Sequence, residues 1–137
     1  MHKNFTHNVK VYYEDTDAGG VVYYANYLKY LERARTEALS NIGLSNAKIK
    51  SDFSALIIVK SCNIEYKKSA HLEDDLQIKS FVASTSKTSF LMNQSIFKDD
   101  ELIVVAKTHL VFINEIFKPV KIPEKILSEF KPYTSSS

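Results

Sequence analysis

One long amphipathic helix, expected over residues 25–42, constrains this chain more than any other feature, because every other long regular segment has the pattern of a strand. Apolar side chains recur there at spacings of three and four, which is the period of an α-helix with one buried face. Gly43 follows the last of them as a natural helix stop. These positions are Tyr27, Tyr30, Leu31, Ala34, Ala38, Leu39 and Ile42.

The remaining regular segments alternate between apolar and polar residues or form continuous apolar runs, as strands do. The polar stretch 98–101 is short enough for a hairpin between two of them. We expect strands at 8–14, 54–66, 76–82, 89–97 and 102–113, and a short helix at 124–130. This order predicts an α+β fold in which a five-stranded antiparallel sheet wraps around the long helix. The open edges of such a sheet predict oligomerisation by edge pairing.

The 137 residues suit a single domain, expected to span 1–137. The 18 basic and 16 acidic residues give a net charge of +2, which offers no basic face for a nucleic acid. No apolar run resembles a signal peptide or a membrane span, so we expect a cytoplasmic protein without membrane insertion. The one cysteine, Cys62, excludes an internal disulfide and a zinc site of several thiolates, and we expect it to be a small buried residue.

The residues that carry chemistry lie in the segment 12–27. The sequence lacks a nucleophile elbow, a phosphate-binding P-loop, a dinucleotide-binding glycine motif and a zinc-binding H-E-x-x-H motif, and its four histidines are scattered. Glu14, Asp15 and Asp17 precede the small residues 18–20, and the long helix begins a few residues later. Such a carboxylate cluster is often only solvated charge or a helix cap. A carboxylate facing a helix N-terminus, however, supplies a nucleophile or base together with donors for an oxyanion.

The stretch 11–39, which contains EDTDAGGVVYY, resembles the signature of the 4-hydroxybenzoyl-CoA thioesterase-like family. It is most similar to the acyl-CoA thioesterases associated with the bacterial Tol–Pal gene cluster. The likeness continues at IEYKKSAHLEDDL (64–76) and at VFINEIFKPVKIPE (111–124). The resemblance implies a hotdog fold, acyl-CoA thioester hydrolysis without a cofactor or metal, and a homodimer or homotetramer with its active sites at the subunit interface.

The resemblance also assigns roles to residues. The essential carboxylate falls on Asp17, which would attack the thioester carbonyl or activate a water. The backbone N–H of Tyr24 would polarise that carbonyl, while Glu14 and Asp15 would shape the loop. The Tol–Pal-associated relatives usually have histidine where this chain has Tyr24, so an imidazole has no role here. Ser69, where relatives often have proline, is a smaller departure.

The substrate contacts implied by the resemblance lie elsewhere in the chain. Lys87, Thr88 and Ser89 occupy the turn that the family uses for the nucleotide part of coenzyme A, although a lysine on a turn is often only solvated. Glu32 falls at the acyl-contacting position. Its charge suits a small or polar acyl group, such as a short-chain or aromatic one, better than a long alkyl chain. A plain salt bridge from Glu32 to Arg35 is the alternative.

Two other functions compete with hydrolysis. A hotdog dehydratase would need a histidine at the helix, and no histidine lies between residues 8 and 70. A non-catalytic hotdog module that binds acyl-CoA or a partner protein would not need Asp17.

Overall fold

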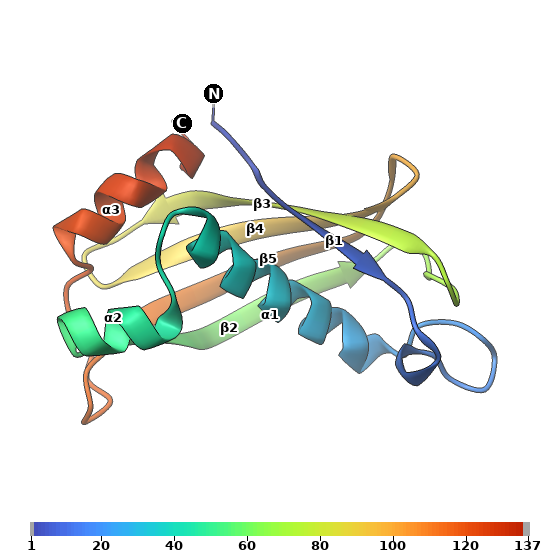
Figure 1. Ribbon diagram of the computed structural model, residues 1–137, viewed down its shortest axis with the longest axis horizontal. Helices are drawn as coiled ribbons and strands as arrows, with labels where there is room; N and C mark the ends of the chain where they lie inside the picture. Colours follow the sequence, from blue (N-terminus) through green and yellow to red (C-terminus); the bar gives the residue numbers. More distant parts are fainter. Residues whose placement is uncertain (1, 136–137) are drawn as a thin grey trace.

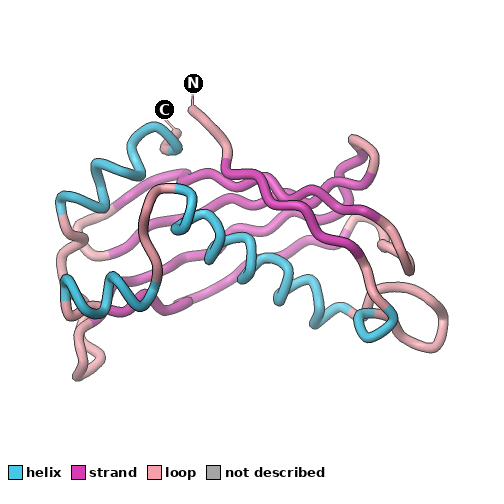
Figure 2. Tube along the Cα trace, viewed as in Figure 1, coloured by secondary structure: helices cyan, strands magenta, loops and turns pink. Residues whose placement is uncertain are grey.

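In the computed structural model, which describes residues 2–135, helix α1 (Tyr24–Asn41) lies across one face of an antiparallel sheet (Figure 1). The strands are β1 (Phe5–Lys10), β2 (Leu56–Tyr66), β3 (Asp75–Thr85), β4 (Ser89–Lys98) and β5 (Glu101–Ile113), in the spatial order β1-β3-β4-β5-β2. The loops gather at the two ends of the strands (Figure 2). The predicted five-stranded α+β architecture is confirmed.

The buried residues under α1 form two clusters, one beneath each half of the helix. Side chains of β3 and β4 alternate between buried and half-buried positions, because successive residues of a strand point to opposite faces. The first cluster includes Tyr27, Tyr30, Leu31, Ile78, Ile96 and Val104, and the second includes Leu39, Phe90, Met92, Leu110, Phe112 and Phe130. The helix therefore buries its predicted apolar face on the sheet.

Helix α1 ends where the sequence predicts. Gly43 has a φ of +77°, a backbone conformation that favours glycine, and the Leu44 N–H donates to the Leu39 carbonyl at 2.8 Å. The following helix α2 (Asn46–Phe53) was not predicted. It has one buried residue, Ile49, and so no apolar stripe to reveal it. The predicted C-terminal helix is α3 (Glu124–Phe130), with the bounds expected.

Two expectations were wrong. The first strand ends at Lys10 rather than at residue 14, and Tyr13 is 81% exposed instead of packing on the sheet. The chain turns there because the Asp15 carboxylate accepts a hydrogen bond from the Tyr12 N–H at 2.9 Å, which closes a short 3₁₀ turn. Cys62 is exposed rather than buried, because β2 lies at the edge of the sheet.

The two edges of the sheet differ. On the β1 side the C-terminal segment runs beside β3, through a bridge between Val82 and Thr134, and the Lys3 N–H donates to the Pro132 carbonyl at 2.9 Å, so the described residues near the two termini lie side by side (Figure 1). On the other side, β2 has no further strand beside it within residues 2–135. Its apolar residues Ile58 and Val59 are 40% and 49% exposed. The open edge is therefore eleven residues long and partly apolar.

Candidate active site

Residues 16–22 form a tight hairpin that leads into α1. Thr16 and Val22 pair as a bridge, and the Asp17 N–H donates to the Val21 carbonyl at 2.9 Å. The Gly20 N–H donates to the Asp17 carbonyl at 3.1 Å, and Gly20 has a φ of +80°, which other residues rarely adopt. The small residues of the sequence motif are therefore needed to close this turn.

The Asp17 carboxylate is exposed at this turn, and one of its oxygens is fixed. Oδ1 accepts hydrogen bonds from the N–H groups of Gly19 at 2.8 Å and Val21 at 3.4 Å. A Cβ at Gly19 would lie 3.3 Å from the same oxygen, so glycine gives the carboxylate its room. Within residues 2–135, Oδ2 has no hydrogen-bond donor. One oxygen thus orients the group and the other is available for chemistry.

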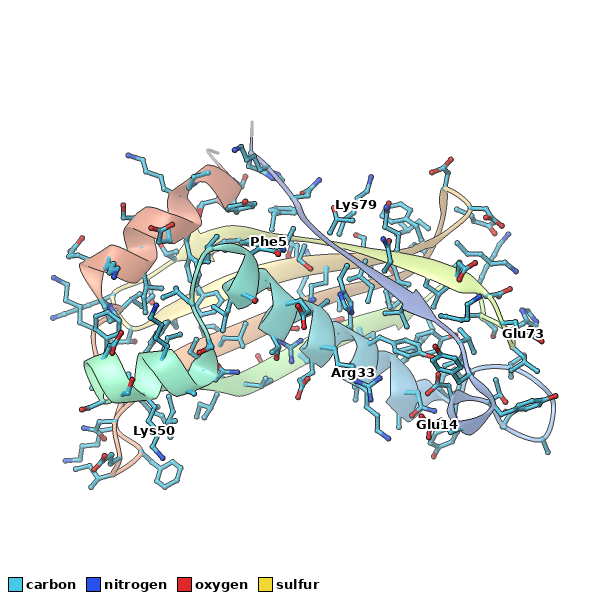
Figure 3. The ribbon with its side chains drawn as sticks, in the orientation of Figure 1. Phe5, Glu14, Arg33, Lys50, Glu73 and Lys79 are labelled. Carbon is cyan, nitrogen blue, oxygen red and sulfur yellow. The ribbon has the colours of Figure 1, made fainter. Side chains whose placement is uncertain are left out.

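Asp15 joins the hairpin to the helix, as the loop-shaping role expected of it requires. Its side chain is buried, and its carbonyl accepts hydrogen bonds from the Tyr23 N–H at 3.0 Å and the Asn26 Nδ2 at 2.8 Å. Burial raises the pKa of the Tyr30 phenol beneath it, and the nearby Asp15 carboxylate raises that pKa further. Glu14, by contrast, is exposed at this end of the molecule (Figure 3).

Tyr24 is the first residue of α1, after the extended residue Tyr23. Its N–H has no acceptor within residues 2–135, as expected for a first-turn donor, and the partial positive charge of the helix N-terminus lies here. The Tyr24 side chain is 63% exposed, and its ring lies 4.8 Å from that of Tyr66. The backbone donor at position 24 is therefore free, while the phenol ring packs toward β2.

A third segment, residues 70–72, is hydrogen-bonded to the hairpin. The Val22 N–H donates to the Ala70 carbonyl at 2.9 Å, and the Leu72 N–H donates to the Gly20 carbonyl at 3.3 Å. The Ala70 N–H in turn donates to the Tyr27 hydroxyl at 2.9 Å, and burial raises the pKa of that phenol. The hairpin is thus held by main-chain bonds on both sides and by a buried helix residue.

The structure does not bring Lys87, Thr88 and Ser89 near Asp17 within one subunit. Lys87 and Thr88 lie on the β3–β4 turn and Ser89 begins β4, whereas the hairpin lies at the opposite end of β3 (Figure 1). Eleven residues of β3 separate the two ends, which is about 33 Å. Lys87 is exposed, and the Ser89 Oγ lies 2.9 Å from the His109 Nε2.

Glu32 lines a cavity of about 200 Å³ between the second half of α1 and the sheet. Arg35 lines the same cavity, and no ion pair within 4 Å joins the two side chains in the described part of the chain. The salt bridge considered as an alternative is therefore absent. Sequence reasoning did not single out Arg35 as a cavity residue, because its place depends on contacts with β4.

Among residues 2–135, no group of three histidine, cysteine or carboxylate side chains could hold a metal ion. In the same part of the chain, no helix is both long and apolar enough to cross a membrane.

Comparison with known proteins adds to this geometry. Residues 11–130 match the model of the thioesterase-like superfamily. Acyl-CoA thioester hydrolase YbgC from Escherichia coli O6:H1 is 38% identical over 125 residues, which cover 90% of this chain and 92% of that protein. These matches confirm the resemblance seen in the sequence.

Solved structures agree on the fold. A 1,4-dihydroxy-2-naphthoyl-CoA thioesterase from Synechocystis superposes with a TM-score of 0.87 at 27% identity, covering 93% of this chain and 96% of that one. A mutant 4-hydroxybenzoyl CoA thioesterase complexed with 4-hydroxybenzoyl CoA gives a TM-score of 0.88 at 20% identity, covering 93% and 99%. The chain therefore belongs to the thioesterase-like superfamily, as a hotdog-fold enzyme that hydrolyses thioesters.

Proposed function

We propose that this enzyme hydrolyses acyl-coenzyme A thioesters, with Asp17 as nucleophile or general base and the Tyr24 N–H as the donor that polarises the carbonyl. The observation that carries the proposal is the hairpin itself. It holds a carboxylate with one free oxygen next to a helix that begins with an unpaired N–H. The E. coli relative is named for acyl-CoA thioester hydrolysis, which supports the same substrate class here.

Either route for Asp17 is chemically complete. In direct attack, Oδ2 bonds to the acyl carbon, the C–S bond breaks, and the thiolate leaves with a proton from solvent. Water then hydrolyses the acyl–aspartyl anhydride to the free acid. In the general-base route, Asp17 takes a proton from a water whose oxygen attacks the same carbon, and the departing thiolate takes that proton. In both routes negative charge develops on the carbonyl oxygen, toward which the Tyr24 N–H would donate.

We propose that the complete site needs two subunits. If the open edge of β2 pairs antiparallel with its copy about a two-fold axis, each sheet is reversed relative to the other. The hairpin of one subunit then lies at the same end as the partner subunit's Lys87. Lys87, Thr88 and Ser89 would contact the nucleotide part of coenzyme A across the interface, in a homodimer or a homotetramer built from it.

We propose short-chain or aromatic acyl groups as the preferred substrates. Glu32, free of an ion pair with Arg35, would lie beside the acyl group, where a charge disfavours a long alkyl chain. The Synechocystis relative is named for an aromatic acyl group. We also propose that the 137 residues form one cytoplasmic catalytic domain.

A panel of acyl-CoAs tests the function directly. Free-thiol release by purified protein is measured with acetyl-, butyryl-, benzoyl- and palmitoyl-CoA, and the Asp17→Asn protein purified in the same way controls for contaminating hydrolases. We expect higher kcat/KM for the short-chain and benzoyl substrates than for palmitoyl-CoA. A value that rises steadily to palmitoyl-CoA removes Glu32 from the acyl site. If every acyl-CoA binds and none is hydrolysed, the non-catalytic binding module is correct.

A further inference from the structure

The cavity beneath the second half of α1 has an apolar interior and a polar rim. Glu32, Arg35, Thr36 and Asn46 contribute the polar side chains of its lining. The rest of the lining is apolar and comes from both helices and strands: Phe5, Ala38, Leu39, Ile57, Val59, Phe90, Met92, Leu110 and Phe130. A ligand that fills it needs an apolar body and a polar group at one end.

Arg35 brings a positive charge to this cavity, and the nearby Glu32 carboxylate favours the charged form without an ion pair to it in the described chain. Of the five N–H donors of its guanidinium, only one is used within residues 2–135, by Nη1 toward the Gln94 Oε1 at 3.0 Å. No carboxylate of the described chain lies within 4 Å. Burial lowers the pKa of Arg35, although arginine keeps its charge at neutral pH. Four charged donors are thus left for an anion.

Gln94 fixes where that charge lies. Its side chain is fully buried, and Nε2 donates to the Leu31 carbonyl and to the Ser80 Oγ, both at 3.1 Å. With both amide hydrogens directed at these acceptors, Oε1 must face Arg35. The guanidinium is therefore tied to the middle of β4 rather than free to turn into solvent.

The apolar part of the cavity extends from this point along β4. Met92 and Phe90 follow Gln94 on the same face of the strand, and the Phe90 ring lies 5.0 Å from that of Phe130. Four residues of strand from Gln94 to Phe90 span about 13 Å. The cavity thus has the Arg35 cation at one end and aromatic rings at the other. The distance between them is similar to the distance from the carboxylate to the terminal methyl group of a medium-length fatty acid.

We propose that this cavity binds an aliphatic monocarboxylate, with the carboxylate on Arg35 and the alkyl chain along Met92, Phe90 and Phe130. A guanidinium and a carboxylate match in charge and in planar, two-pronged geometry. The ligand would share the cavity in which Glu32 is proposed to lie beside the acyl group, so this inference deepens that assignment by naming Arg35 as the anion contact, although binding itself needs no step of hydrolysis. Because thioester hydrolysis releases a carboxylic acid, the site would also retain an aliphatic product.

Direct binding tests the proposal on the unsubstituted 137-residue protein. Isothermal titration calorimetry is done with octanoate and with 1-octanol, which has the same chain length and no charge. The difference in affinity isolates the contribution of the carboxylate from that of the alkyl chain. We expect octanoate to bind about tenfold more tightly than 1-octanol, the size expected of one charge-assisted contact. Equal affinity for the two ligands overturns the proposal.

Three variants assign the effect to Arg35. Arg35→Met should weaken octanoate about tenfold and leave 1-octanol within about twofold, whereas Arg33→Met, the same change at an exposed arginine of α1 (Figure 3), should alter neither. Glu32→Gln should tighten octanoate binding, because it removes a like charge from the rim. Equal losses of both ligands in Arg35→Met, or equal effects at Arg33 and Arg35, mean that Arg35 only supports the fold.

Arg35→Lys keeps the result decisive if Arg35→Met does not fold, as judged by circular dichroism. The lysine retains the charge but not the two-pronged geometry, so octanoate should remain preferred over 1-octanol by a smaller factor. Loss of that preference with the charge still present overturns the proposal. Because binding is measured without turnover, failure of the proposed hydrolysis would leave these outcomes unchanged.

Discussion

At the N-terminal end of α1, the polar groups are a main-chain N–H and a carboxylate that an exposed hairpin holds by main-chain hydrogen bonds. In the second half of the same helix, the polar groups are the side chains of Glu32 and Arg35 around an apolar cavity. Both regions use one helix of 18 residues, about 27 Å long. They differ in whether the backbone or the side chains supply the donors.

This difference determines what each region tolerates. At the N-terminal end, a substitution matters when it removes the N–H at position 24, the conformation of Gly20 or the free oxygen of Asp17. In the second half, charge and volume matter, because Arg35 and its neighbours act through side-chain atoms. The two regions can therefore be separated by substitutions that change only one kind of group.

The largest effect is expected from Asp17→Asn. Asparagine keeps the shape of the side chain and an oxygen for the Gly19 N–H, but it can neither attack the acyl carbon nor take a proton from water. Turnover should fall by about 100-fold or more, while folding and acyl-CoA binding remain nearly intact.

The measurement for Asp17→Asn is free-thiol release from one good acyl-CoA, with circular dichroism to verify the fold. Glu14→Gln, a change of the same kind at the exposed neighbouring acid, should cost much less, and so should Asp15→Asn. Retention of a third of wild-type turnover by Asp17→Asn would reject the mechanism.

Tyr24→Pro tests the backbone donor by itself. Proline lacks an N–H but is tolerated at the first position of a helix, and Tyr23 already has the extended conformation that a following proline requires, with φ −69° and ψ 137°. The helix should therefore form without its donor. We expect kcat to fall about 100-fold, as for the loss of one oxyanion donor, with helical content by circular dichroism unchanged. Wild-type turnover in a folded Tyr24→Pro protein would exclude this N–H from the site.

Ile58→Lys tests whether the hairpin of one subunit must meet the Lys87 turn of another. The side chain lies 40% exposed on the open edge of β2, where a charge opposes strand pairing. Sedimentation at micromolar concentration should show a dimer or larger species for wild type and a smaller one for the variant. The specific activity of the Ile58→Lys variant should fall about tenfold when the protein is diluted. It should recover at high protein concentration, because mass action restores the dimer.

Ile116→Lys is the matched control, since Ile116 is 68% exposed and lies outside the strands. It should leave both sedimentation and activity unchanged. A fully active wild-type monomer would contradict the shared site.

How much of this could be predicted from the sequence depended on the range of the interaction involved. The span of α1, its stop at Gly43 and the bounds of α3 follow from local periodicity and backbone preference, and the residue pattern also indicated a loop of carboxylates and small residues before α1. The early end of β1 did not follow, because one contact between the Asp15 carboxylate and the Tyr12 N–H turns the chain.

Sheet order was beyond the sequence for a related reason. An apolar sequence such as that of β2, with Cys62, favours a buried strand, yet the strand lies at an edge of the sheet. Strand order is set by pairing between segments that are distant in the sequence. The cavity residue Arg35 was missed in the same way, since its partner Gln94 lies 59 residues further along the chain.

The smallest effect is expected from Tyr24→Phe, at the same position as the proline variant. Phenylalanine keeps the N–H and the ring that lies 4.8 Å from Tyr66, and within residues 2–135 the lost hydroxyl makes no hydrogen bond. Turnover should stay within about twofold of wild type, because the donor that acts on the carbonyl is retained. A fall of about 100-fold in Tyr24→Phe would show that the phenol itself does chemistry. A small effect of phenylalanine beside a large effect of proline would locate the function of position 24 in its backbone.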